Sequence, residues 1–242
     1  MSTTPRLLAA FGAALVLALP AFAQEAAIRK AIAERLPQFP KIDEVREAPL
    51  KGLYEVRVGT DIFYTDAAGN HLIEGQLIDT RTRTNLTEQR IAKLTAIDFA
   101  TLPLNDAIVF KTGTGARKLA VFADPNCGYC KRFERDLSNV KDVTVYTFLY
   151  PILGGDSPEK SRDIWCAKDN TKAWRDWMID GIKPQRSVGQ CDTAALARVT
   201  ALGRKHKVNG TPALVFEDGK RVPGAMAPAD IEKQLAIAQA KS

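Results

Sequence analysis

The chain has little cysteine and almost no histidine, with four cysteines and two histidines among 242 residues. A structural zinc site usually needs two pairs of closely spaced Cys or His ligands. Only Cys127 and Cys130 are close in sequence, and His206 has no neighbouring His or Cys. A c-type haem site needs histidine directly after the second cysteine, where this chain has Lys131. We therefore predict no metal site and no cofactor.

Beyond its first residues the chain lacks any apolar run long enough to cross a membrane. The N-terminal run extends only from Leu7 to Leu19, follows Arg6 and ends before Pro20. A bilayer-spanning helix needs about 20 apolar residues. The run is followed by the small-residue pattern of Ala21-Phe22-Ala23, which is typical of a signal peptide. We predict that residues 1–23 are removed and that the exported protein is not embedded in a membrane.

The chain also lacks a long basic block, although its formal net charge is +6 at pH 7. Acidic and basic residues are interspersed, and the short clusters at Lys131-Arg132 and at residues 204–207 fit solvated helix faces. We predict no nucleic-acid partner.

In an oxidising compartment, an even number of cysteines is consistent with two pairs.

Residues 24–83 are predicted to form a small α+β domain. An amphipathic helix is expected over residues 25–38, followed by strands at 52–59, 61–66 and 71–80. A linker helix is then predicted over residues 84–105. Asn85 and Glu88 resemble a capping box at its start.

Residues 106–242 alternate between strand and helix patterns. Strands are expected at 117–125, 143–150 and 212–218, and helices at 130–137, throughout much of 157–207 and from Pro228 onward. Ser157 is expected to cap a helix whose first residue is Pro158. The order predicts an α/β thioredoxin-like domain with a helical insertion.

The sequence CGYC at 127–130 stands where a strand gives way to a helix. A helix N-terminus favours negative charge, so Cys127 is expected to ionise readily to the nucleophilic thiolate. Cys130 lies one turn further and is expected to be more buried, where it can attack a mixed disulfide at Cys127. An inert disulfide is disfavoured because so short a loop has little closure entropy to remove. The pair is therefore interpreted as a redox dithiol.

Two further features accompany the dithiol. Thr211-Pro212 directly precedes a strand, where proline marks a strand start or a special peptide bond, and the sequence leaves its isomer open. Cys166 and Cys191 are far apart in sequence. They fit either a structural disulfide, which we favour, or a second redox couple.

Four segments resemble the DsbC and DsbG family of periplasmic disulfide isomerases. They are CGYC at 127–130, IWCAKD at 164–169, GTPA at 210–213 and VPG at 222–224. The resemblance covers essentially the whole mature chain, and Gly128 favours the DsbC branch, because proline is usual there in DsbG.

The resemblance implies a periplasmic homodimer with a cystatin-like N-terminal dimerisation domain. It implies that Cys127 attacks and Cys130 resolves, that Gly128, Tyr129, Thr211 and a cis Pro212 support the site, and that Cys166 pairs with Cys191. The implied partners are misfolded disulfide-containing exported proteins and a DsbD-like membrane reductase.

Three alternatives stay open at this stage. One is a DsbG-like reductase or oxidoreductase that protects single cysteines. Another is a dimeric chaperone whose dithiol is incidental. A third is a metal-trafficking protein that binds copper or zinc, and copper fits the dithiol better than zinc, since two thiolates suffice for Cu(I).

Overall fold

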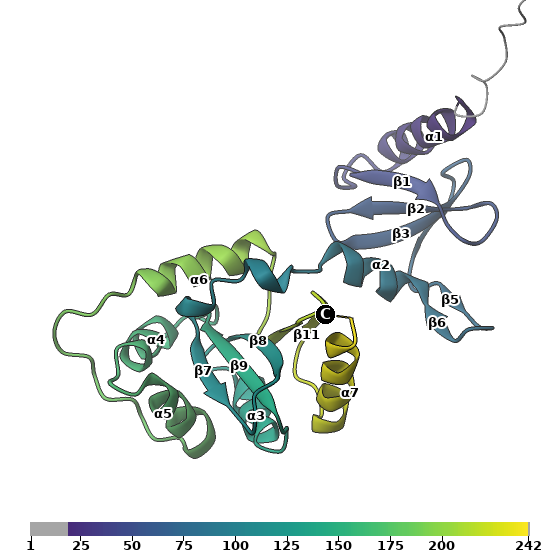
Figure 1. Ribbon diagram of the computed structural model, residues 1–242. Coiled ribbons are helices and arrows are strands. Elements are labelled where there is room, and N and C mark those ends of the chain that lie inside the picture. Colours follow the sequence, from purple (N-terminus) through teal and green to yellow (C-terminus); the bar gives the residue numbers. More distant parts are fainter. Residues whose placement is uncertain (1–18, 242) are drawn as a thin grey trace, which may run out of the picture. The chain divides into compact units, whose positions relative to one another are not determined.

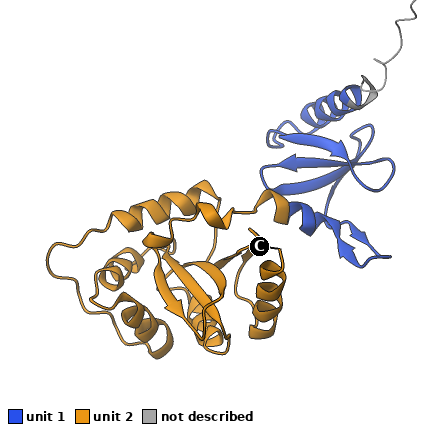
Figure 2. Cartoon of the chain, viewed as in Figure 1, with its two compact units in different colours: residues 1–91 blue, residues 92–242 orange. Residues whose placement is uncertain are grey.

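The computed structural model describes residues 19–241 of the chain and the side chains from Phe22 onward. The predicted signal peptide falls mainly on residues 1–18, which lie outside the described part. The chain divides into two compact units, one ending at Ile91 and the other beginning at Ala92 (Figure 2).

The first unit combines a helix with a four-stranded antiparallel sheet of order β1-β2-β3-β4 (Figure 1). Its elements are α1 (Leu19–Arg35), β1 (Glu44–Glu47), β2 (Leu53–Val58), β3 (Asp61–Asp66), β4 (Leu72–Glu74) and the small hairpin β5 (Ile78–Asp79) and β6 (Thr84–Asn85). Ile28 and Ile32 of α1 are buried in one apolar cluster with Val45 and Val56 of the sheet. The α+β prediction for this region is confirmed.

Several boundaries in this unit differ from the predictions. The helix α1 ends at Arg35 rather than at residue 38, because Pro37 disfavours helical backbone at the residue before it. The single strand predicted over 71–80 is wrong, since β4 and β5 belong to different sheets. The strand β1 was not predicted, because its sequence EVRE carries only one apolar residue.

The helix after this sheet is shorter than predicted. The helix α2 runs from Leu86 to Leu94, and the Asn85 side chain accepts a hydrogen bond from the Glu88 amide at 3.0 Å, which is one of the two hydrogen bonds of the predicted capping box. A separate 3-10 turn, η1, follows at Phe99–Thr101 and is capped by Asp98. Phe99 is buried in this turn.

The second unit is built on a five-stranded sheet of order β11-β10-β8-β9-β7. Only β8 and β9 pair in parallel; the other neighbours are antiparallel. Its strands are β7 (Ile108–Lys111), β8 (Arg117–Ala123), β9 (Val143–Leu149), β10 (Ala213–Phe216) and β11 (Arg221–Pro223). Its helices are the 3-10 turn η2 (Leu104–Asp106), α3 (Gly128–Leu137), α4 (Ser157–Trp165), α5 (Asn170–Arg175), the π-helix η3 (Asp176–Asp180), α6 (Ala194–Lys205) and α7 (Pro228–Gln239).

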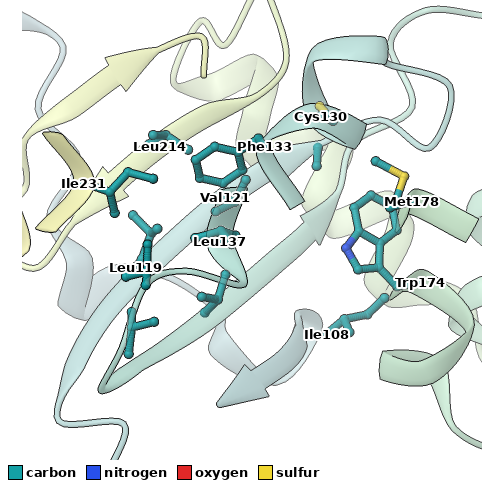
Figure 3. Packing of buried hydrophobic residues seen from close by; sticks show 14 of the residues in the cluster. Ile108, Leu119, Val121, Cys130, Phe133, Leu137, Trp174, Met178, Leu214 and Ile231 are labelled. Carbon is teal, nitrogen blue, oxygen red and sulfur yellow. The ribbon is translucent and has the colours of Figure 1, made fainter. Parts of the chain in front are cut away.

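The central strand β8 separates two apolar cores. Successive strand side chains point to opposite faces, so Leu119 and Val121 face one core while Ala120 and Phe122 face the other. The first core is closed by α3 and α7 together with residues of α5 and η3, and Figure 3 shows Cys130 among its side chains. The second core is closed in part by α6. The prediction of an α/β domain with helices inserted between β9 and β10 is confirmed.

The start of α4 differs by one position from the prediction. Asp156 is the N-terminal flanking residue, and Ser157 is already helical. The Ser157 hydroxyl instead donates a hydrogen bond to the buried Asp124 carboxylate at 2.7 Å.

No helix in the described part of the chain is long and apolar enough to cross a membrane.

Candidate functional site

The first cysteine of the CGYC sequence caps the helix that carries the second. Strand β8 ends at Ala123, a tight turn follows, and Cys127 occupies the N-cap of α3 with extended backbone. The Cys127 sulfur accepts a hydrogen bond from the Cys130 amide at 3.3 Å. An N-cap side chain satisfies an amide that would otherwise lack a helical partner, and negative charge is favoured at this position.

The two cysteines are free thiols with different surroundings. Cys127 is 4% exposed and Cys130 only 1%, while Gly128 and Tyr129 between them are exposed, Tyr129 to 70%. Burial raises the pKa of the Cys130 thiol strongly, and the neighbouring Cys127 raises it further. The Cys130 thiol therefore stays protonated. Cys127, by contrast, lies at the helix N-terminus and is placed to act as the nucleophile.

The segment Thr211-Pro212 lies against the dithiol, although it is more than 80 residues away in sequence. The Cys127 thiol donates to the Thr211 carbonyl oxygen at 3.2 Å, and the Thr211–Pro212 peptide bond is cis. Antiparallel pairing of β10 with β8 explains this position, because Ala213 pairs with Phe122 and so carries the preceding residues to the end of β8. The sequence interpretation had placed these residues at one site, and the structure brings them together.

A buried carboxylate organises the turn before Cys127 and was missed by the sequence interpretation. Asp124 is fully buried, and its carboxylate accepts hydrogen bonds from the Asn126 amide, the Ser157 hydroxyl and the Leu153 amide at 2.7–2.9 Å. Its carbonyl oxygen also accepts the Cys127 amide at 3.0 Å. One residue therefore ties the dithiol turn to α4 and to the loop after β9.

A tryptophan with two lysines forms the other support of this turn. The Trp177 indole nitrogen donates to the Pro125 carbonyl at 2.6 Å. The ammonium groups of Lys131 and Lys160 lie 3.8 and 4.8 Å from the centroid of its ring. Lys160 also donates to the Asn126 side chain at 2.9 Å. Two cations thus lie at Trp177, whose indole bonds to the turn before Cys127.

A hollow of about 400 Å³ opens beside the dithiol. It is lined by Tyr129, Arg132, Asp136, Thr211 and the segment 224–228. Its walls come from the helix that carries the cysteines, the loop before β10 and the loop before α7. Within residues 19–241, no group of three or more His, Cys, Asp or Glu side chains is arranged to hold a metal ion.

Comparison with known proteins identifies the family of this chain. Residues 19–88 match the family described as disulfide bond isomerase protein N-terminal domain, and residues 104–239 match the thioredoxin-like domain family. The probable thiol:disulfide interchange protein DsbC of Bordetella pertussis is 46% identical over 212 residues, which cover 88% of this chain and 74% of the relative. The chain belongs to the DsbC family.

Two further members of the comparison support this assignment. The thiol:disulfide interchange protein DsbC of Escherichia coli K12 is 30% identical over 231 residues, covering 91% of this chain and 92% of the relative. A crystal structure of a disulfide interchange protein from Neisseria gonorrhoeae is 40% identical with a TM-score of 0.54, covering 57% of this chain and 99% of that one. The predicted resemblance to DsbC is confirmed.

The remaining two cysteines of this DsbC family member form a disulfide away from the dithiol. Cys166, which caps the end of α4, is bonded to Cys191 in the loop before α6, with a sequence separation of 25 residues. The bond closes part of the helical insertion into a loop. A crosslink of this length restricts the unfolded chain and stabilises the folded one.

Removing this disulfide tests whether it is structural. We expect Cys166→Ala/Cys191→Ala to lower the free energy of unfolding by about 3–4 kcal/mol, the chain-entropy value for a loop of this size. Urea denaturation measures the loss, and the folded variant should exchange disulfides through Cys127 at the wild-type rate. A folded variant that has lost exchange would instead favour a second redox couple.

A buried glutamate in the helix of the dithiol gives a pH-dependent contribution to stability. Glu134 accepts the Trp174 indole hydrogen at 2.7 Å, and the Arg175 guanidinium lies 4.0 Å from its other oxygen. Burial raises the pKa of Glu134 above its usual value despite these two partners. The folded state therefore holds this proton more tightly than the unfolded state, and stability decreases as pH rises through the window between the two pKa values.

Glu134→Gln removes this titration while keeping an acceptor for Trp174. We expect the difference in unfolding free energy between variant and wild type to shift in favour of the variant as pH rises from 4 to 7. Urea denaturation at several pH values measures it, with the exposed Glu159→Gln as the matched control. A difference that stays constant over this range would contradict the assignment.

Proposed function

We propose that this protein is a periplasmic disulfide isomerase that works through Cys127 and Cys130. The observation that carries the proposal is the position of the Cys127 sulfur. It caps α3, receives the Cys130 amide and faces the Thr211 carbonyl beside an open hollow. This arrangement joins a nucleophilic sulfur to a surface that can receive a polypeptide.

The proposed reaction begins with the Cys127 thiolate attacking one sulfur of a client disulfide. A bond forms between Cys127 and that sulfur, and the other client sulfur leaves as a thiolate. A different client thiolate can then attack the mixed disulfide, which restores the Cys127 thiolate and leaves a rearranged client disulfide. No electrons are gained or lost in this cycle, so the reduced dithiol is regenerated without a reductant.

The mixed disulfide can also be resolved by attack of Cys130, and this reaction is a second exit from it. Its proton must first be removed, and then the Cys127–Cys130 disulfide forms while the client leaves as a reduced thiol. Because burial raises the pKa of Cys130, this exit is slow relative to attack by an exposed client thiolate. The slow exit supports isomerisation over simple reduction, which is the activity of the DsbG-like alternative. A DsbD-like membrane reductase would return an oxidised dithiol to its reduced form.

The proposal includes location and assembly. The N-terminal pattern Arg6, apolar run and Ala21-Phe22-Ala23 supports export to the periplasm. The match of residues 19–88 to the DsbC N-terminal domain supports a homodimer formed through that unit, which would hold misfolded clients as a chaperone does. Light scattering on the purified protein should give twice the mass of one chain; a monomer would contradict the dimer.

Refolding of a scrambled multi-disulfide client tests the isomerase proposal. In a glutathione buffer the reduced protein should restore the native disulfides and the activity of the client. Accumulation of fully reduced client would favour the DsbG-like reductase. Client that is kept soluble but stays scrambled would favour a chaperone with an incidental dithiol.

A further inference from the structure

Three cations stand on the helix face that follows the dithiol. Lys131, Arg132 and Arg135 belong to α3 and are partly or fully exposed, and we call them the basic rim. Asp136 is the only carboxylate of this helix outside the core, and its oxygen is 3.8 Å from Arg132. Within residues 19–241, Lys131 and Arg135 have no ion pair. The rim therefore carries uncompensated positive charge.

The Lys131 side chain is held in place by a contact with an aromatic ring. Its ammonium group lies 3.8 Å from the centroid of the Trp177 ring, and its amide donates to the Cys127 carbonyl at 3.0 Å. Burial, together with the nearby charges of Lys160 and Arg135, lowers the pKa of Lys131. A partly buried cation beside other cations gains stability when an anion approaches.

Arg132 is the member of the basic rim that lines the hollow beside the dithiol. Its side chain is 73% exposed, and it lines that hollow together with Tyr129, Thr211 and the carboxylate of Asp136. The positive charge of the rim that Asp136 does not offset is that of Lys131 and Arg135. A polypeptide whose sulfur reaches Cys127 must lie near Thr211, whose carbonyl is 3.2 Å from that sulfur. The residues next to the reacting client cysteine would therefore pass over Arg132.

We propose that the basic rim selects client polypeptides that carry aspartate or glutamate next to the reacting cysteine. The inference rests on the proposed function, because it names the class of client that the dithiol site prefers. Complementary charge raises the rate of encounter and disfavours like-charged partners. Clients with lysine or arginine beside the cysteine would be attacked more slowly.

Three synthetic peptide disulfides test this preference. They differ only in the residues flanking the cysteine, which are glutamate, glutamine or lysine. The second-order rate of exchange with the reduced full-length protein is measured by acid quench and mass spectrometry. We expect rates in the order glutamate, glutamine, lysine, with a ratio of about 10 between the extremes at low salt. The ratio should approach 1 in 1 M NaCl, where the screening length is about 3 Å.

The double variant Arg132→Gln/Arg135→Gln assigns the preference to the rim. Both side chains are exposed, so the variant should fold, and its glutamate-to-lysine ratio should fall to within about twofold of 1. The control Lys51→Gln/Arg81→Gln removes two exposed charges from the N-terminal unit and should keep the wild-type ratio. Alkylation by neutral iodoacetamide should be unchanged in both variants.

Two results would overturn the proposal. One is equal exchange with all three peptides by the wild type. The other is a double variant that loses rate equally with every peptide and with iodoacetamide, because the rim would then act on Cys127 itself. A wild-type protein that exchanges with none of the peptides would overturn the proposed function, and with it this inference.

Discussion

Cys127→Ser is expected to lose disulfide reshuffling by at least about 10³-fold, because a serine hydroxyl is a weak nucleophile at neutral pH. No other cysteine can replace it. Cys130 is buried and held protonated, and Cys166 is bonded to Cys191. The measurement is recovery of native activity from a scrambled multi-disulfide client in a glutathione buffer.

The serine variant should remain folded, which makes it a clean test. Its hydroxyl oxygen can accept the Cys130 amide as the sulfur does, so the N-cap of α3 is kept. Equal urea midpoints for variant and wild type would establish this. If dimerisation creates a client-binding surface, the variant should still slow client aggregation. Reshuffling at the wild-type rate by a folded Cys127→Ser would contradict the assignment of Cys127 as the attacking residue.

Cys130→Ser is expected to separate isomerisation from reduction. Without the second thiol, the mixed disulfide at Cys127 loses its intramolecular exit and should persist at least about 10²-fold longer when the client offers no other thiol. Net reduction of a peptide disulfide should therefore almost stop. A client with several cysteines can still release itself, so reshuffling should be retained in large part.

Mass spectrometry of acid-quenched samples measures the lifetime of the mixed disulfide. The matched control is Cys166→Ala/Cys191→Ala, which keeps the dithiol and should release clients at the wild-type rate. If Cys130→Ser releases a single-disulfide peptide as fast as the wild type, Cys130 is not the resolving thiol. If it loses reshuffling as completely as Cys127→Ser, the slow-exit explanation for isomerase activity is wrong.

The elements predicted from the sequence are those with a clear pattern or run of apolar side chains. Strand β3 was predicted with its observed bounds, and β8 and β9 followed from their apolar runs. Two short strands were not predicted. The strand β1 carries only one apolar residue, and β7 has only four residues, too few to show an alternating pattern. Both are formed by pairing with a neighbouring strand. Likewise, the apolar spacing that suggested one long helix after Asn85 is shared between α2 and a separate 3-10 turn.

The dithiol could be predicted because the residues that indicate it are neighbours in sequence. The residues that hold its turn in place, Asp124 and Trp177, could not be predicted, because their partners are distant in sequence. The strand before Cys127 and the helix after it are adjacent in sequence, and so their effect on the thiol can be argued from four residues and their flanks. Asp124 bonds to Ser157, which is 33 positions away, and Trp177 bonds to Pro125 at a separation of 52. Such pairs depend on how α4 and η3 pack, which no spacing in this sequence records.

The role of Cys127 is tested most directly by locating the sulfur that bonds to a client. Reduced wild-type protein is mixed with excess peptide disulfide, quenched in acid within seconds and digested, and the mixed disulfide is mapped by mass spectrometry. We predict that the client sulfur is joined to Cys127. Attachment to Cys130, Cys166 or Cys191 as the first product would contradict it.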